Sequence, residues 1–378
     1  MELKKYKLGD CFRMAENGLV IKQTKAAKGM PITRIETLSN DCFNRDRLGY
    51  GDIFDEEKYS HYILDDKDLL MSHINSRTFL GRTVLYRKRN GEKIIHGMNV
   101  LRIKTNQDIL NPIFASYLFR TSLFKRHIDN IRKDAINQSS FALSDLKNIE
   151  LYIPTVKEQN KIAYTLQLLD SKIALNRQIN DNLEEQLRLI TSRYIFSCPN
   201  LEKKRIGEIA TVKAGGDCPI TFSKTRTQKC NIPIFSNGTE DRGLYGFTNK
   251  ANIEGHSITV AARGTIGYCE RRLMPFVPII RLLAITPKED GAYIYLHQVI
   301  RGMKFKKNGS VQQQLTVPEI SFIEIPYPHS SILYEYNKVA SPIVEMIERN
   351  ISENEILTKQ RDELLPLLMN GQASVNSD

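Results

Sequence analysis

Basic and amide side chains gather in two stretches of the chain, and both stretches contain glycine turns. Lysine and arginine suit contacts with phosphate, whereas Arg, Gln, Asn, Ser and Thr match the donors and acceptors on base edges. The first set comprises Arg77, Arg82, Lys88, Arg89, Lys125, Arg126, Arg132, Lys133, Gln138 and Ser139. The second set comprises Arg263, Thr265, Tyr268, Arg271, Arg272, Lys304, Lys306, Lys307, Gln312 and Gln313. We predict that these clusters contact double-stranded DNA; for any single member the alternative is a solvated surface charge.

The net charge of the chain favours a polyanionic partner. The 378 residues carry a formal charge of +11. Residues 155–197 have a net charge of +1 and residues 331–371 have a net charge of −3, so the rest of the chain carries +13. A basic balance outside the predicted long helices is typical of nucleic-acid binding.

Motifs that suggest an enzyme are incomplete in this chain. Residues 111–114 (NPIF) lack the second proline of the Asn-Pro-Pro-aromatic motif of adenine methyltransferases. Asp41, Glu56 and Lys58 follow the order of a metal-nuclease site, but such triples are common in charged loops. The seven histidines have no metal-ligand spacing, and there is no Walker A motif. We therefore expect no catalytic residue, metal or cofactor in the chain; a standalone endonuclease using residues 41–58 and a coiled-coil scaffold are the alternatives.

The cysteines and the apolar runs indicate a cytoplasmic protein. Six cysteines are scattered without a C-x-x-C pair, so neither a zinc site nor a disulfide framework is expected. The sequence has no uninterrupted apolar stretch of ~18 residues, so we expect no membrane contact. The first ten residues, MELKKYKLGD, do not have the apolar run of a secretory signal.

The sequence repeats itself at an offset of 174 residues. Residues 138–190 align with 312–364 without a gap, and nine of the 53 aligned positions are identical. Each copy contains a glutamine, a strand, a proline and then a long helix. The upstream halves correspond more faintly, with Gly9 opposite Gly207. This order predicts two globular units, each followed by a helix.

The upstream units have the pattern of an α/β (α+β) fold. Short β-branched runs alternate with glycine turns, and residues 111–133 are amphipathic, with Asn111 as helix cap and Pro112 as the first helical residue. We predict a first globular domain at 1–154, a first helical region at 155–199, a second globular domain at 200–328, and a second helical region with the C-terminal tail at 329–378.

Both predicted long helices carry the apolar rhythm of a coiled coil, with spacings that alternate between four and three. Asparagines take two successive seam positions in each helix. The residues predicted to pair the helices are Ile173, Asn176, Asn180, Leu183, Ile347, Asn350, Asn354 and Leu357. A buried asparagine fixes register because its amide needs a partner, so we predict an intramolecular antiparallel coiled coil with pseudo-two-fold symmetry. Surface helices whose asparagines face water are the alternative.

The predicted length of the second helix suggests a spacer. Ser341-Pro342 has the residue types of a helix cap and a first position, which favours a helix start there. The 24 residues from Pro342 to Leu365 would span roughly 36 Å at ~1.5 Å per residue. That length matches one turn of duplex DNA, about 34–36 Å. We therefore predict a bipartite target whose two half-sites differ, because the globular units differ.

With these features, the chain resembles the specificity subunit of type I restriction–modification systems. The resemblance rests on IELYIPTVKEQNKIAYTLQLLDSKIALNRQINDNLEEQ, on IEIPYP with IVEMIERNISENEILTKQRDELLPLLMNG, on the openings LGD and IGE, and on ARGTIGY. It covers essentially the whole chain. Two sites depart from the family pattern: PHSSILYEYNK lacks the Glu-Gln pair of PTVKEQNK, and SRTFLGRT lacks a Gly-Thr-Ile-Gly sequence.

The resemblance implies a division of labour among several subunits. The globular domains at 1–154 and 200–328 would be target-recognition domains, each reading one half of a split DNA target. The helices would set the spacing and dock two modification subunits. Those partner subunits would bind S-adenosylmethionine and methylate adenine, and restriction subunits would complete the complex.

Overall fold

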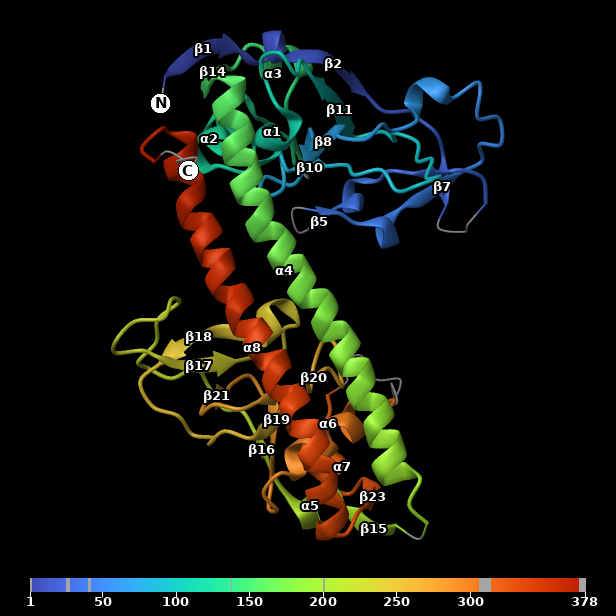
Figure 1. The fold of residues 1–378 in the computed structure, drawn as a ribbon, viewed down its shortest axis with the longest axis vertical. Coiled ribbons are helices and arrows are strands. Elements are labelled where there is room, and N and C mark those ends of the chain that lie inside the picture. Colours follow the sequence, from blue (N-terminus) through green and yellow to red (C-terminus); the bar gives the residue numbers. More distant parts are fainter. Residues whose placement is uncertain are drawn as a thin grey trace. The chain divides into compact units, whose positions relative to one another are not determined.

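The computed structural model describes residues 2–24, 28–39, 42–136, 138–199, 201–305 and 314–373. The chain forms two compact units (Figure 1). The first contains Met1–Ala174 and Asn354–Asp378, and the second contains Leu175–Glu353. In the described part of the chain, no helix has both the length and the apolar character needed to cross a membrane.

The first unit is built on a four-stranded antiparallel sheet. Its order is β10 (Thr83–Leu85), β8 (Leu69–Ser72), β11 (Val100–Thr105) and β2 (Phe12–Asn17). Successive side chains of a strand point to opposite faces, so Met71 joins the core under the helices while Leu70 joins a second cluster with Val84. Both faces of β8 are therefore buried, and the sheet is a rigid support for the loops at its ends.

Two helices cover one face of this sheet, α1 (Pro112–Leu118) and α2 (Ser122–Ile131). The predicted start is confirmed: the Asn111 side chain accepts hydrogen bonds from the backbone of Ile113 at 2.7 Å and of Phe114 at 3.0 Å, with Pro112 in the first turn. The stretch 111–133 is not one helix, because the Thr121 hydroxyl accepts from Phe124 N at 3.2 Å and starts a second.

The second unit repeats this plan. Its sheet has the equivalent order β20 (Cys269–Arg272), β19 (Ser257–Val260), β22 (Leu283–Pro287) and β16 (Ala210–Ala214), and it packs with α6 (Ala292–Gly302). β15 (Glu202–Arg205) pairs with β23 (Glu324–Tyr327) as β1 (Leu3–Lys7) pairs with β14 (Glu150–Pro154) in the first unit.

Two glycines show how closely the repeat is kept. A Cβ on Gly9 would lie 3.1 Å from Lys147 Cβ, at the end of α3 (Leu143–Lys147). A Cβ on Gly207 would lie 3.1 Å from Ser321 Cβ, at the end of α7 (Val317–Ser321). Gly207 belongs to the short helix α5 (Ile206–Ile209). The same close approach therefore recurs in both units.

The units differ in what is inserted between the shared strands. In the first unit, the segment between β2 and β8 forms β3 (Gln23–Thr24), β4 (Pro31–Ile32), β5 (Leu38–Ser39), β6 (Cys42–Phe43) and β7 (Gly49–Gly51). A further small sheet contains β9 (Ile74–Asn75), β12 (Lys133–Asp134) and β13 (Ser139–Ser140). In the second unit, β17 (Ile232–Phe235), β18 (Leu244–Thr248) and β21 (Val277–Pro278) form a separate three-stranded sheet.

Two long helices complete the chain, α4 (Val156–Thr191) and α8 (Ser330–Met369). In the second unit, Asn180 Nδ2 donates to Ile347 O at 3.1 Å, and the hydroxyls of Thr191 and Tyr336 are 2.9 Å apart. Residue numbers rise along α4 while those of the contacted residues fall along α8, so the helices are antiparallel there. The predicted mixed α/β class with two long helices is confirmed.

The predicted helix start at Ser341-Pro342 is wrong. α8 begins twelve residues before Pro342, at Ser330, and continues through that proline. The Pro342 side chain is exposed, so its ring lies on the solvent side, where water can bond the carbonyl that lacks an N–H partner.

Candidate nucleic-acid interface

Three connecting segments meet at one end of each four-stranded sheet. In the second unit, Ala214, Leu283, Val260 and Cys269 lie side by side across the sheet. Beyond this row, β16 continues into Gly215-Gly216, β22 is entered by the turn 279–282, and β19 joins β20 through residues 261–268. In the first unit the equivalent row is Asn17, Leu101, Met71 and Thr83. We call this end of the four strands, together with its three connecting segments, the loop end of each sheet.

The structure brings five predicted basic residues of the first unit together near its loop end. Arg77 and Arg82 lie in the loop between β8 and β10, Lys125 and Arg126 lie on α2, and Arg132 directly follows that helix. Lys125 Nζ donates to the carbonyls of Arg77 at 3.1 Å and Leu80 at 2.9 Å, so the helix fixes the loop.

The charges in this cluster repel one another. Burial lowers the pKa of Lys125; the nearby Asp129 raises it, and the charges of Arg132, Arg77 and Arg82 lower it further. The Arg82 guanidinium stacks 4.3 Å from the centre of the Phe79 ring, and Arg132 pairs with Asp129 and, at 2.7 Å, with Asp134. Arg77 and Arg126 are exposed, so an anion such as a phosphate can approach them and relieve the repulsion.

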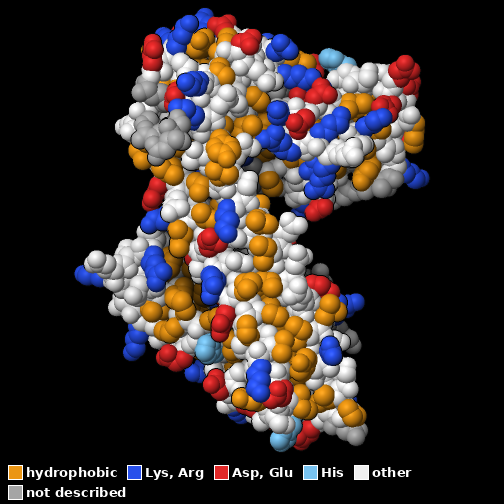
Figure 2. All heavy atoms as spheres, in the orientation of Figure 1, with side chains coloured by type: hydrophobic (Ala, Val, Ile, Leu, Met, Phe, Trp, Pro, Cys, Tyr) orange, Lys and Arg blue, Asp and Glu red, His pale blue; other side chains and the backbone are white. Residues whose placement is uncertain are grey.

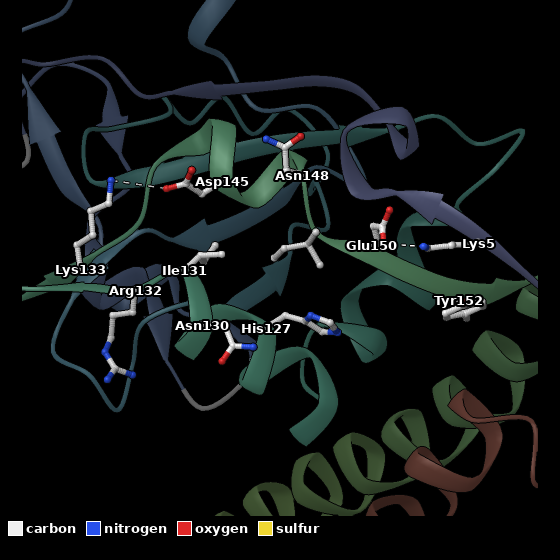
Figure 3. Close-up of a pocket in the computed structure, with 11 residues that line it drawn as sticks. Lys5, His127, Asn130, Ile131, Arg132, Lys133, Asp145, Asn148, Glu150 and Tyr152 are labelled. Atoms are coloured by element: carbon white, nitrogen blue, oxygen red, sulfur yellow. Dashed lines mark ion pairs between the residues drawn. The ribbon is translucent and has the colours of Figure 1, made fainter.

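The next predicted residues lie on the small sheet formed by β9, β12 and β13. Lys133 points toward Asp145, with Nζ 3.7 Å from the carboxylate, at an open pocket of about 790 Å³ (Figure 3). Gln138 is exposed. Ser139 is buried, and its hydroxyl donates to Asp134 at 2.6 Å, so the prediction that Ser139 contacts DNA does not fit the structure.

Lys88 and Arg89 lie apart from this cluster. They follow the other end of β10, where Leu85 pairs with Leu69 rather than with the row at the loop end. The Lys88 backbone bonds Asp66 at 3.1 Å. These two residues are close to Arg82 in the sequence, which suggested one cluster. The extended strand β10 lies between them, so they are at the opposite end of the sheet.

In the second unit, the glycine loop 261–268 presents Arg263 and Thr265 to solvent. Gly267 has φ = +87°, and a Cβ there would collide with the Phe305 ring, so only glycine fits. Arg263 donates to Gln314 Oε1 at 2.8 Å. Tyr268 is half-buried with its hydroxyl on Glu270, and Lys304 is exposed; Lys306, Lys307, Gln312 and Gln313 lie outside the described residues.

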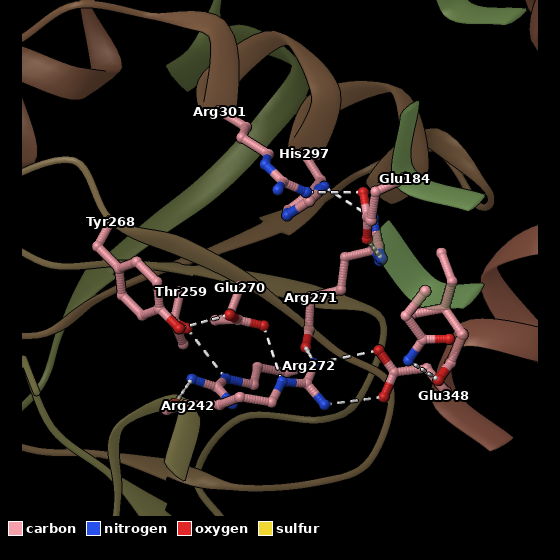
Figure 4. Close-up of polar contacts among 12 residues, drawn as sticks. Glu184, Arg242, Thr259, Tyr268, Glu270, Arg271, Arg272, His297, Arg301 and Glu348 are labelled. Atoms are coloured by element: carbon pink, nitrogen blue, oxygen red, sulfur yellow. Dashed lines mark hydrogen bonds and ion pairs between the residues drawn. The ribbon is translucent and has the colours of Figure 1, made fainter. Parts of the chain in front are cut away.

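Arg271 and Arg272 require a correction, because both are buried, with 4% and 6% exposure. Arg271 pairs with Glu184 of α4 and approaches His297 Nδ1 at 3.0 Å (Figure 4). Arg272 Nε donates to Thr259 Oγ1 at 3.0 Å, and burial lowers its pKa to about 10. These arginines support the fold of the second unit rather than reaching DNA.

The sequence analysis did not identify some exposed polar and basic residues of the second unit. The segment that leaves Gly216 carries three exposed basic side chains, Lys224, Arg226 and Lys229. The run SKTRTQK mixes basic and small polar residues, and this composition could have been used to predict them as DNA contacts. Asn237 was also missed: its Oδ1 accepts from Ala262 N at 2.7 Å, and its Nδ2 donates to Ile280 O at 2.6 Å. It thereby joins two segments of the loop end.

Two of the residues that imitate a nuclease, Glu56 and Lys58, have other partners in the structure. Glu56 pairs with Lys93 at 2.6 Å, and the Lys58 ammonium lies 5.5 Å from the Tyr59 ring. Asp41 lies outside the described residues. Within the described ranges, no group of three or more His, Cys, Asp or Glu side chains is arranged to hold a metal ion.

The predicted helix-pairing residues are buried or half-buried in the structure. Asn350 Nδ2 donates to Asn180 Oδ1 at 2.8 Å, and Asn176 Nδ2 donates to Glu353 Oε2 at 2.6 Å. The other members of the set are Ile173, Leu183, Ile347, Asn354 and Leu357. The asparagine amides thus find partners on the facing helix within the second unit.

Comparisons with known proteins agree with one another. The family model described as type I restriction modification DNA specificity domain matches residues 1–185 and 200–365. A putative type I restriction enzyme MjaX specificity subunit from Methanocaldococcus jannaschii is 28% identical over 400 residues, covering 98% of this chain and 93% of the relative. The crystal structure of a type I restriction-modification S subunit from M. genitalium has a TM-score of 0.61 at 17% identity, covering 98% of this chain and 96% of that one.

Proposed function

Because the chain belongs to the type I restriction modification DNA specificity family, we propose that it recognises the DNA sequence on behalf of a type I restriction–modification complex. It does so without catalytic residues of its own. The proposal covers a bipartite target, with one half-site for each unit.

The observation that carries this proposal is the duplicated sheet with different loop ends. The row Asn17-Leu101-Met71-Thr83 corresponds to Ala214-Leu283-Val260-Cys269, and the glycine turns before Thr83 and Cys269 close in the same way. The insertions differ in length and in strand pattern. A common support with different exposed residues suits two readers of different short sequences.

Phosphate contacts would come from the exposed basic residues of each loop end. In the first unit these are Arg77 and Arg126, and in the second Arg263 and Lys304, with the basic segment after Gly216. Sequence discrimination would come from the polar side chains beside them, such as Gln138 and Thr265. Lys133, which is exposed on β12, remains a proposed DNA contact.

The long helices would serve as the platform for partner subunits. Apolar side chains reach the surface of both, including Leu168 and Leu175 on α4 and Met346 and Ile356 on α8. On the face in Figure 2, apolar side chains lie among charged ones. Such exposure on a helix is expected where another chain covers it. Two modification subunits, which would carry S-adenosylmethionine, would dock here, and restriction subunits would complete the complex.

We place this work in the cytoplasm, where the target DNA of such a system lies. The six cysteines are all unpaired, as expected where thiols are kept reduced.

The test is selection from a random-sequence duplex library at several salt concentrations, with and without a candidate modification subunit. We expect enrichment of two short motifs separated by a fixed gap, strengthened by the partner, with binding that weakens as salt rises. Enrichment of one contiguous motif would refute the bipartite target. No enrichment in the presence of the cognate partner would refute DNA recognition itself.

A further inference from the structure

The turn that enters the central strand β22 has an unusual backbone. Ile280 and Arg281 both have positive φ, 52° and 60°, and Leu282 N donates to Ile279 O at 3.0 Å. Positive φ at both central residues belongs to a type I′ turn, which normally contains Asn-Gly. A β-branched residue such as Ile280 is strongly disfavoured in this region.

The surrounding chain holds the turn in place. Ile280 N donates to Gly216 O at 2.9 Å, and Arg281 N donates to Gly215 O at 3.0 Å. Asn237 bonds Ile280 O and also Ala262, the residue before the glycine loop. The backbone is therefore fixed by both neighbouring segments of the loop end, while the side chains are left outside.

The side chains of this turn face solvent. Ile280 is 47% exposed, and Arg281 is exposed next to it. In the part of the chain that the structure describes, no side chain pairs with the Arg281 guanidinium. The surrounding hydrogen bonds thus keep the backbone of this turn in a strained conformation while the Arg281 side chain stays exposed. Backbone strain of this kind is common at binding sites, which suggests that Arg281 contacts a ligand.

The first unit has a turn at the same place in its sheet, with different side chains. Leu19 bridges Gly97 as Gly216 bridges Ile279, and Met98 N donates to Leu19 O at 3.1 Å. Asn99 has φ = +67° at the position of Arg281, whereas Met98, at the position of Ile280, is not among the residues with positive φ. Met98 and Asn99 are both exposed.

The place of this turn and its hydrogen bond to the neighbouring segment are thus duplicated, whereas the exposed dipeptide is Met98-Asn99 in one unit and Ile280-Arg281 in the other. Resting on the proposed function, we infer that this dipeptide determines sequence specificity in each half-site, with Arg281 and Asn99 reading base edges. Arginine can donate two hydrogen bonds to guanine, and asparagine can bond adenine in a similar paired way. The difference between these two residues fits two unlike half-sites.

The test uses the full-length chain with its modification subunit and the random-sequence duplex library. Arg281→Asn keeps a residue that tolerates positive φ, and Arg281→Gly keeps the turn while removing the side chain. We expect either variant to lower discrimination at one base pair of one half-site by roughly 5- to 150-fold, and to leave the other half-site unchanged. Asn99→Arg should change only the opposite half-site.

Arg193→Asn is the matched control, because Arg193 is an exposed arginine of the second unit in the turn after α4. It should leave both motifs unchanged. Melting temperatures of all variants establish that they fold. If Arg281→Gly folds and keeps the wild-type motif, or if binding falls equally for all sequences, the inference is overturned. A wild-type chain that enriches no motif would instead refute the proposed function.

Discussion

Replacing Glu184 with alanine should destabilise the second unit strongly. Glu184, on α4, has a side chain that is 18% exposed, and it pairs with the buried Arg271 and, at 2.7 Å, with Arg301. His297 is beside Arg271, and burial holds its pKa well below the usual range, so the imidazole stays neutral and cannot compensate for the charge of Arg271. Without Glu184, neither guanidinium group would keep a carboxylate partner among the described residues.

The expected loss follows from the burial of Arg271. Removing one partner of a buried ion pair costs about 3–5 kcal/mol, because the other charge stays desolvated. Since Arg301 is about half exposed, water can compensate for its share, and most of the loss would come from Arg271. Arg271→Met in the same chain should recover most of the stability, because the uncompensated charge is then gone.

The assay is urea unfolding followed by circular dichroism, together with hydrogen exchange of the β20 amides. Glu185→Ala is the matched control: Glu185 is the next residue on α4, and it pairs with Arg188 in solvent, with side-chain exposures of 57% and 61%. It should have little effect. If Glu184→Ala loses no more stability than Glu185→Ala, or if Arg271→Met adds a further loss, the reasoning about this network is refuted.

Three further predictions concern other parts of the chain. Buried His96, which donates from Nε2 to Val100 O at 2.7 Å, has a pKa lowered to about 4. As the pH is lowered, this histidine is therefore protonated in the unfolded chain before it is protonated in the folded one. The free energy of unfolding should decrease by about 1.4 kcal/mol per pH unit from pH 6.5 to pH 4. His96→Gln should flatten that part of the pH–stability curve, and an unchanged slope would contradict the assignment. Asn350→Leu leaves Asn180 Oδ1 without its donor and should cost about 1–3 kcal/mol in thermal unfolding. Leucine at both Asn180 and Asn350 should restore stability, but the partner subunits should then bind with a less defined stoichiometry, measured by light scattering. Arg77→Ala with Arg126→Ala should weaken binding to all DNA sequences alike and reduce the slope of log K against log salt by about 0.9 for each phosphate that is no longer neutralised; a slope equal to that of the wild type would place these residues outside the interface.

The features that the sequence predicted well are those encoded by spacing. The long helices and their asparagines follow from periodicity, and the 174-residue repeat made two similar units visible. Asn111-Pro112 marked a helix start correctly because the capping chemistry is local. Pro342 misled the same reasoning, since an exposed proline can be accommodated within a long helix.

Burial was much harder to predict than residue type. Arg271 and Arg272 have the composition of a DNA contact, and only the paired strands and α4 reveal that they face acidic and aromatic partners inside the unit. The turn at Ile280-Arg281 contains neither glycine nor asparagine, so no local signal indicates its positive φ values. Its conformation depends on hydrogen bonds to residues more than 40 positions away.

The two units also differ in how the chain closes them. The second unit is one continuous segment, but the first unit needs Asn354–Asp378 to join Met1–Ala174. Leu368 and Met369 belong to the same core as Ile162 and Leu166. A ribosome therefore makes every residue of the second unit before the last part of the first unit exists. During synthesis the unit that starts first is therefore completed last. Its core near Leu166 of α4 stays incomplete until the end of α8 has been made.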